Sequence, residues 1–166
     1  MFLDEAGFNL AMTRSYARSP ANERAFSTKP GNKGGNISMV GSIRLSGLVA
    51  LYPYDGAVDG YRFLDYLENQ LLKSLNPGDV LVMDNLRVHH IEPVREMLRK
   101  AQITPLFLPP YSPELNPIEE AWSKIKSIFR GLEARTIPAF VDVLNETYSS
   151  ITVENITGWF QHAGYS

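Results

Sequence analysis

The apolar run Val80–Met83 constrains the fold more than any other feature of the sequence. It has no alternating polar residue, and it ends directly at Asp84 and Asn85. Such a run predicts a strand that is buried on both faces in the middle of a sheet. A helical pattern at 92–101 and a second apolar run at 103–108 follow. Together these segments predict a strand–helix–strand crossover between parallel strands.

Antiparallel strands and further helices are predicted around this unit. Residues 1–10 indicate a short strand that leads into a loop, and 37–44 and 48–53 indicate a hairpin closed by a glycine-containing turn. Apolar residues recur at helical spacing in four further segments: 61–75, from Asn116 onward, from Thr136 onward and 153–160. We therefore expect an α/β fold with a mixed sheet of three antiparallel and then two parallel strands, with flanking helices. A length of 166 residues favours one domain over residues 1–166.

The composition narrows the kinds of site that the chain can build. Cysteine is absent, which excludes disulfides, thiolate nucleophiles and cysteine-bound zinc. Asp and Glu number 18 and His only 3, so a metal ion would be held mainly by carboxylates. No run of about 18 apolar residues and no signal peptide is recognisable. We therefore expect a cytoplasmic protein that does not associate with membranes.

Positive charge is concentrated in one segment, although the net charge is only −2. Between Ala11 and Gly47, Glu23 is the single acidic residue. The basic residues of this segment are Arg14, Arg18, Arg24, Lys29, Lys33 and Arg44. Clustered charges on a loop are often only a solvated surface. The alternative is a face that contacts phosphate groups.

Acidic residues occur where predicted elements begin or end. Asp4 ends the first strand, Asp84 ends the most buried strand, and Glu119 and Glu120 begin the third helix. Ligands of open α/β sheets collect beyond the carboxyl ends of strands, so these acids are candidates for one site. Each also has a structural alternative. Asp84 can belong to a turn, and Glu119 can form a capping box with Asn116 as the N-cap residue.

Convergence of three carboxylates would dictate the chemistry of the site. Two carboxylates about 4 Å apart repel by about 4 kcal/mol at an effective dielectric constant near 20. Such a cluster must hold a proton or bind cations, and oxygen ligands suit Mg²⁺ or Mn²⁺. These ions take their remaining ligands from water and phosphates, which suggests a phosphodiester substrate and a two-metal mechanism. A metal-free hydrolase that uses two carboxylates as acid and base remains an alternative.

Helical geometry separates the two adjacent glutamates. At about 100° per residue, Glu119 borders the apolar stripe of its helix, whereas Glu120 points toward solvent. Glu119 is therefore the candidate ligand. Ser123, Lys126 and Arg130 follow on the same side as Glu119. They can follow a phosphate backbone or form an ordinary solvated face.

Three segments together resemble the catalytic domain of DDE transposases. They are residues 3–8 (Leu-Asp-Glu-Ala-Gly-Phe), residues 82–85 (Val-Met-Asp-Asn) and residues 108–119 (Leu-Pro-Pro-Tyr-Ser-Pro-Glu-Leu-Asn-Pro-Ile-Glu). His89 and His90 follow the second segment, and 34 residues separate its aspartate from the glutamate of the third. The resemblance is to the bacterial insertion-sequence branch of the mariner-like superfamily.

This resemblance implies a ribonuclease H-like fold in which Asp4, Asp84 and Glu119 are the catalytic, metal-binding triad. The implied cofactors are two Mg²⁺ or Mn²⁺ ions per site. The implied reaction is cleavage of DNA at transposon ends and transfer of the freed 3′-hydroxyl into target DNA. DNA is then the partner, and the active complex is expected to be a homodimer.

Further residues receive roles from the same resemblance. Asn85 and His89 are expected near the triad, supporting it or contacting DNA, with Glu120 as a neighbour. The charge pattern, not the resemblance, selects the residues expected to bind DNA, which are Arg14, Arg18, Lys29, Lys33, Lys126 and Arg130. Only three residues precede Asp4, so we expect the family's N-terminal helix-turn-helix region to be absent. The alternative function is a non-catalytic transposase remnant that acts as a folded interaction domain.

Overall fold

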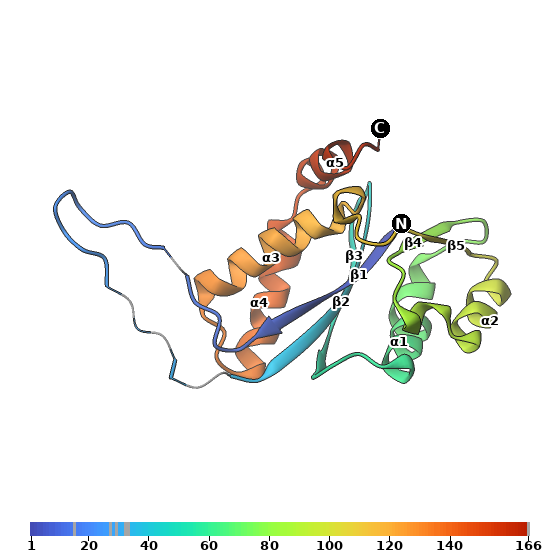
Figure 1. Ribbon diagram of the computed structural model, residues 1–166, viewed down its shortest axis with the longest axis horizontal. Helices are drawn as coiled ribbons and strands as arrows, with labels where there is room; N and C mark the ends of the chain where they lie inside the picture. Colours follow the sequence, from blue (N-terminus) through green and yellow to red (C-terminus); the bar gives the residue numbers. More distant parts are fainter. Residues whose placement is uncertain (15, 27, 29, 32–33, 166) are drawn as a thin grey trace.

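A single five-stranded sheet forms the centre of the molecule (Figure 1). The structure is a computed structural model that describes residues 1–14, 16–26, 28, 30–31 and 34–165. The strands are β1 (Phe2–Asn9), β2 (Asn36–Arg44), β3 (Gly47–Asp55), β4 (Val80–Met83) and β5 (Thr104–Phe107), in the spatial order β3-β2-β1-β4-β5. β3, β2 and β1 are antiparallel to one another, and β1, β4 and β5 are parallel. The predicted mixed α/β sheet is confirmed.

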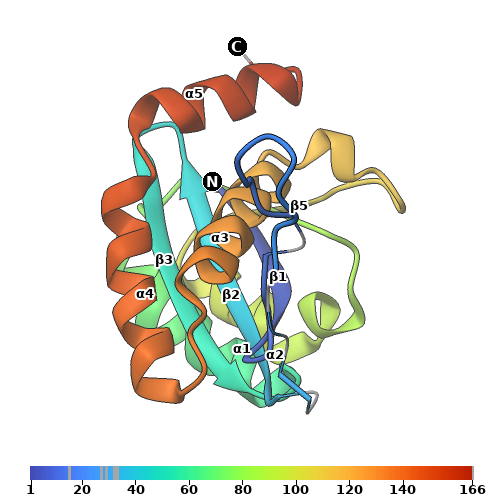
Figure 2. The same cartoon turned by 90° about the vertical axis from the view of Figure 1, so that its left-hand side faces the viewer.

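Helices cover both faces of the sheet. Figure 2 looks onto the face that carries α3 (Ile118–Leu132), α4 (Ile137–Ser150) and α5 (Val153–His162). α1 (Gly60–Tyr66) and α2 (Glu92–Lys100) lie on the opposite face. Each face has its own apolar core, and the two cores are separated by the sheet. None of the helices in the described part of the chain is long and apolar enough to cross a membrane.

The alternation of side chains along β1 divides the first motif between the two cores. Phe2, Ala6 and Phe8 pack into the core under α3, α4 and α5, whereas Leu3 packs into the core under α1 and α2. Residues two apart along a strand share a face. Asp4 therefore faces α3, and Glu5 faces the opposite layer.

Two helices differ from their predicted form. The helix predicted at 61–75 is a succession of α1, a π-helical segment (Leu67–Leu71) and a 3₁₀ turn (Leu72–Ser74). α3 begins at Ile118 and has no side-chain cap. The predicted cap, Asn116, instead donates its side-chain amide to Asp4, and its backbone N–H donates to the carbonyl of Pro113. The capping-box alternative for Glu119 is therefore wrong.

The connection between β1 and β2 extends away from the sheet (Figure 1). Its aromatic side chains Tyr16 and Phe26 are exposed. Arg135 holds the base of the connection, because its guanidinium donates to the carbonyls of Leu10 (3.2 Å) and Met12 (2.9 Å). This part of the chain is thus anchored at its base near the end of α3.

Candidate active site

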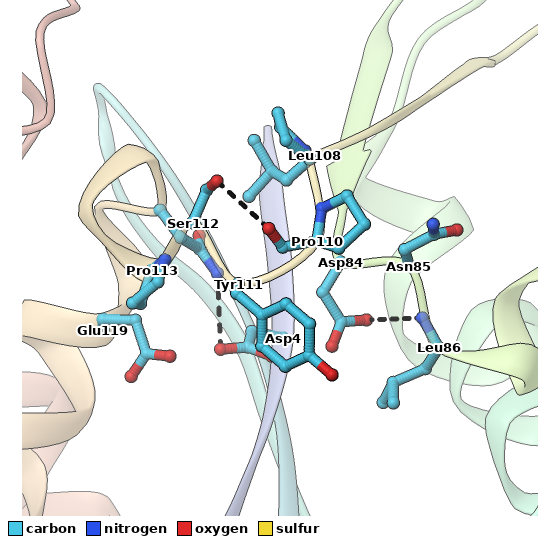
Figure 3. A pocket seen from close by; sticks show the side chains of 12 residues that line it. Asp4, Asp84, Asn85, Leu86, Leu108, Pro110, Tyr111, Ser112, Pro113 and Glu119 are labelled. Carbon is cyan, nitrogen blue, oxygen red and sulfur yellow. Dashed lines mark hydrogen bonds between the residues drawn. The ribbon is translucent and has the colours of Figure 1, made fainter.

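Asp4, Asp84 and Glu119 line one cavity of about 410 Å³, which lies at the carboxyl end of β4 and beside the first half of β1 (Figure 3). The prediction that Asp4 ends its strand is wrong, because β1 continues to pair with β2 as far as Asn9. β1 supplies the first acid, the end of β4 supplies the second, and the first turn of α3 supplies the third. The remaining lining residues are Asn85, Leu86, Leu108, Pro109, Pro110, Tyr111, Ser112, Pro113 and Asn116. The fold therefore brings together three acids that are far apart in the sequence.

Asp4 is the most deeply buried of the three acids, with 6% of its surface exposed. Its Oδ1 accepts the backbone N–H of Glu5 at 2.8 Å. Its Oδ2 accepts the indole N–H of Trp122 at 3.3 Å and the side-chain amide of Asn116 at 3.4 Å. Donors from β1, from α3 and from the turn before α3 therefore fix the orientation of this carboxylate.

Burial changes the proton affinity of Asp4. Burial raises its pKa, the hydrogen bond from the Glu5 backbone lowers it, and the charges of Glu119 and Asp84 raise it. The result is a pKa of about 7. Near neutral pH, the metal-free site is therefore poised between holding a proton and carrying its full negative charge.

Asp84 is held by the turn that follows β4. Its Oδ1 accepts the backbone N–H of Leu86 at 3.2 Å and lies 2.9 Å from Nδ1 of His89. His89 is buried, and its ring packs on Phe63 with 4.5 Å between the ring centroids. This imidazole does not line the cavity, and it therefore supports Asp84 from outside it.

His89 also faces the acid that follows Asp4 in β1. Its Nε2 lies 3.7 Å from Oε1 of Glu5, which is too long for a hydrogen bond, and both atoms are buried without a partner. Burial lowers the pKa of His89, but the carboxylates of Asp84 and Glu5 outweigh it and raise the pKa to about 9. The imidazolium thus lies between the strand of Asp4 and the end of β4.

The two adjacent glutamates lie as the helical angle predicts. Glu119 lines the cavity, whereas Glu120 does not. Oε1 of Glu120 instead lies 3.8 Å from Nε2 of His162 in α5. Asn85 lines the cavity as well, and its side-chain carbonyl contacts the ring of His90.

Of the residues predicted to bind DNA, those that the structure describes do not line the cavity. Arg14 packs against Gly131 of α3 and lines a shallow hollow together with Arg18. Lys126 lies over the ring of Phe8, 5.7 Å from its centroid, and Arg130 is exposed. Lys29 and Lys33 lie outside the described residues.

The two side chains that donate to Asp4 are not predicted to have this role by the sequence. The sequence predicts a helix cap for Asn116, and the helical spacing of Trp122 predicts only a core residue. Both donate to Asp4. The polar N–H of Trp122 is the one sequence signal that could have suggested this role, because a buried indole usually finds an acceptor.

Carboxylate and amide oxygens line the cavity, and such oxygens suit hard divalent cations. The carboxylates do not, however, surround a common point at the spacing of metal ligands. No group of three or more His, Asp or Glu side chains in the described part of the chain is arranged to hold a metal ion. Nevertheless, the cavity walls present carboxylates from three elements. The raised pKa of Asp4 indicates that this negative charge requires compensation.

Comparisons with known proteins agree with this architecture. Residues 1–141 match the family described as DDE superfamily endonuclease. The Tcb2 transposase of Caenorhabditis briggsae is 27% identical over 166 residues, covering 94% of this chain and 61% of the relative. The Mos1 strand transfer complex superposes with a TM-score of 0.75 at 19% identity, and the Mos1 paired-end complex with Mg with a TM-score of 0.74 at 17%. Each superposition covers 98% of this chain. It covers 51% of the Mos1 chain in the strand transfer complex and 52% of the Mos1 chain in the paired-end complex. The shared fold is that of the Mos1 catalytic domain, which is ribonuclease H-like.

Proposed function

Because the chain belongs to the DDE superfamily endonuclease family, we propose that it is a transposase catalytic domain that cleaves DNA at transposon ends and joins the freed 3′-hydroxyl to target DNA. The observation that carries this proposal is the shared cavity of Asp4, Asp84 and Glu119. The chain spans about three-fifths of its nematode relative and about half of the Mos1 chain.

The three acids are proposed to hold two Mg²⁺ or Mn²⁺ ions. When bound, such ions supply activation of the attacking water or hydroxyl and stabilisation of the leaving oxygen. The chain itself supplies a rigid setting, because backbone and side-chain donors orient Asp4, and His89 orients Asp84. Asn85 lines the same cavity and is proposed to contact DNA there, with Glu120 as a neighbour outside the cavity.

Nicking of supercoiled plasmid DNA tests this function. We expect nicked circles in the presence of Mn²⁺ or Mg²⁺ and none after addition of EDTA. Nicking should increase from about pH 6 to about pH 8, because Asp4, with its pKa raised to about 7, must lose its proton to take a cation. Cleavage that persists in EDTA would favour a metal-free hydrolase. If the chain cleaves no DNA under any of these conditions, the result would favour a non-catalytic remnant.

DNA is proposed to lie along α3 and the base of the connection between β1 and β2. Arg130 lies eleven residues beyond Glu119, which is about 16 Å along a helix. Lys126, Arg14 and Arg18 would add phosphate contacts, as would Lys29 and Lys33, whose positions rest on the sequence alone. Contacts of this kind position DNA without reading its sequence.

We expect DNA binding by the isolated chain to be weak, salt-sensitive and indifferent to sequence. With about four phosphate contacts, affinity should fall about a hundredfold between about 50 and 200 mM salt. Arg130→Ala should reduce the slope of log affinity against log salt by about one. Fluorescence anisotropy measures both quantities. Lys100→Ala is the matched control, since Lys100 pairs with Glu96 on the opposite helical layer. Tight, sequence-selective binding at about 200 mM salt would contradict this expectation.

Finer assignments rest on the motifs. The 34-residue interval between Asp84 and Glu119 supports the bacterial insertion-sequence branch of the mariner-like superfamily, and with it a bacterial cytoplasmic protein.

The two separate cores on one continuous sheet support a single catalytic domain over residues 1–166. A homodimer is the proposed active form, and sedimentation of the protein bound to transposon-end DNA would measure it.

A further inference from the structure

Asn116 occupies a fixed place in the wall of the candidate active site. It lines the cavity between Asp4 and Glu119, and only 5% of its surface is exposed. Its backbone N–H donates to the carbonyl of Pro113 at 2.9 Å, and its own carbonyl accepts the N–H of Glu119 at 3.1 Å. The backbone on both sides thus holds the side chain in position.

The orientation of the Asn116 amide follows from its neighbour. The nitrogen Nδ2 lies 3.4 Å from Oδ2 of Asp4. A carboxylate accepts and an amide nitrogen donates, whereas a flipped amide would place two oxygens against each other. The carbonyl Oδ1 of Asn116 is therefore directed away from this contact.

This carbonyl oxygen is buried without a hydrogen-bond partner. Buried polar atoms in folded proteins nearly always have a partner, so an exception points to a missing donor. Among the described residues, two other buried side-chain atoms lack a hydrogen-bond partner. They belong to Glu5 and His89, lie 3.7 Å apart, and are accounted for by an ion pair. No such neighbour accounts for Oδ1 of Asn116 within the described residues.

We propose that Asn116 is a fourth oxygen-bearing residue of the cation site, and that its Oδ1 accepts a hydrogen bond from water held by the divalent ion. The inference rests on the proposed function, which places divalent ions between Asp4, Asp84 and Glu119. Mg²⁺ retains several waters in protein sites, and these waters are donors. One amide thus donates to a carboxylate ligand and accepts from the hydrated ion.

Calorimetric titration of the metal-free protein with Mn²⁺ at about pH 8 tests this role. Asn116→Ala should weaken Mn²⁺ binding about tenfold or more. The control is Trp122→Phe, which removes the other donor to the same oxygen of Asp4 but no acceptor. It should weaken binding about threefold at most. Equal losses in the two variants would mean that Asn116 acts only by holding Asp4, and would overturn the proposal.

Asn116→Asp separates the oxygen from the amide donor. The variant keeps an oxygen in place and adds a charge that attracts the cation, so Mn²⁺ should bind at least as tightly as in the wild type. Mn²⁺ should also raise its melting temperature more than that of the wild type. Affinity as low as in Asn116→Ala would overturn the proposal. If Asn116→Ala does not melt cooperatively and is therefore not folded, the Mn²⁺ affinity of Asn116→Asp alone tests the proposal.

Asp84→Asn distinguishes this inference from the proposed function. If wild type and Asp84→Asn bind Mn²⁺ equally, the cation site itself is wrong, and both proposals fall. If Asp84→Asn loses binding while Asn116→Ala keeps it, only the role of Asn116 falls. Loss in both variants, together with retention in Asn116→Asp, supports both proposals.

Discussion

Replacing Asp84 with asparagine is expected to abolish metal-dependent nicking of DNA while leaving the fold intact. Asp84 directly follows β4 and contributes one wall of the cavity shared with Asp4 and Glu119. Loss of one carboxylate from the cation site should remove about 4 kcal/mol or more of transition-state stabilisation, which is about a thousandfold in rate. Nicking of supercoiled plasmid in Mn²⁺ measures this loss, and calorimetry measures the accompanying loss of Mn²⁺ affinity.

The substitution is isosteric, so its structural cost should be small. An asparagine carbonyl can accept from the backbone of Leu86 and from Nδ1 of His89, as the carboxylate does now. Stability should fall by roughly 1–2 kcal/mol, because the contact with His89 loses its charge. Asp142→Asn is the matched control on exposed α4 surface and should retain full activity. Equal nicking by Asp84→Asn and the wild type would show that Asp84 is not part of the active site.

The sheet could be predicted from the sequence because its signals are local. The apolar run Val80–Met83 has the length and composition of a buried strand, and proline and glycine mark the ends of most helices. The parallel crossover from β4 to β5 follows from the helical pattern that the sequence shows between them. The place of Asp84 beyond the end of its strand was predictable for the same reason.

The supporting residues of the site could not be predicted, because their roles depend on tertiary contacts. Asn116 precedes a helix, where asparagine is a common cap, and local propensity gives no hint that its amide turns to Asp4, 112 residues away. Trp122 has the spacing of a core residue and is one, yet its N–H reaches the same carboxylate. Glu5 carries no sequence signal that pairs it with His89. Such long-range pairings are decided by how α3 and the turn after β4 pack on the sheet.

The change from α- to π-helical hydrogen bonding after Tyr66 also left no signal in the sequence. The apolar residues of 61–75 recur at ordinary helical spacing, which predicts one continuous helix. In the structure, Leu67 and Leu71 both stay buried in the core beneath the sheet. The hydrogen-bond pattern therefore changes while the buried face is retained.

Replacing Gly41 with alanine is expected to destabilise the protein and loosen the site. Gly41 lies on β2 directly opposite Asp4. A Cβ atom there would lie 2.5 Å from Cη2 of Trp122 and 2.8 Å from Cδ2 of Leu51. Both side chains are buried, so the clash should cost about 1–3 kcal/mol, as overpacked core positions do. Urea unfolding measures the change.

The second effect of Gly41→Ala follows from the contact of Trp122 with Asp4. Displacing the indole removes a donor from a carboxylate whose pKa is already about 7, so its proton should be held more tightly and Mn²⁺ binding at about pH 7 should weaken. Gly7→Ala is the matched control, because Gly7 lies on β1 with nothing within 4 Å of the added carbon. That variant should be neutral or stabilised by up to about 1 kcal/mol. Equal stabilities for the two variants would show that the space at Gly41 is not required for Trp122 to reach Asp4.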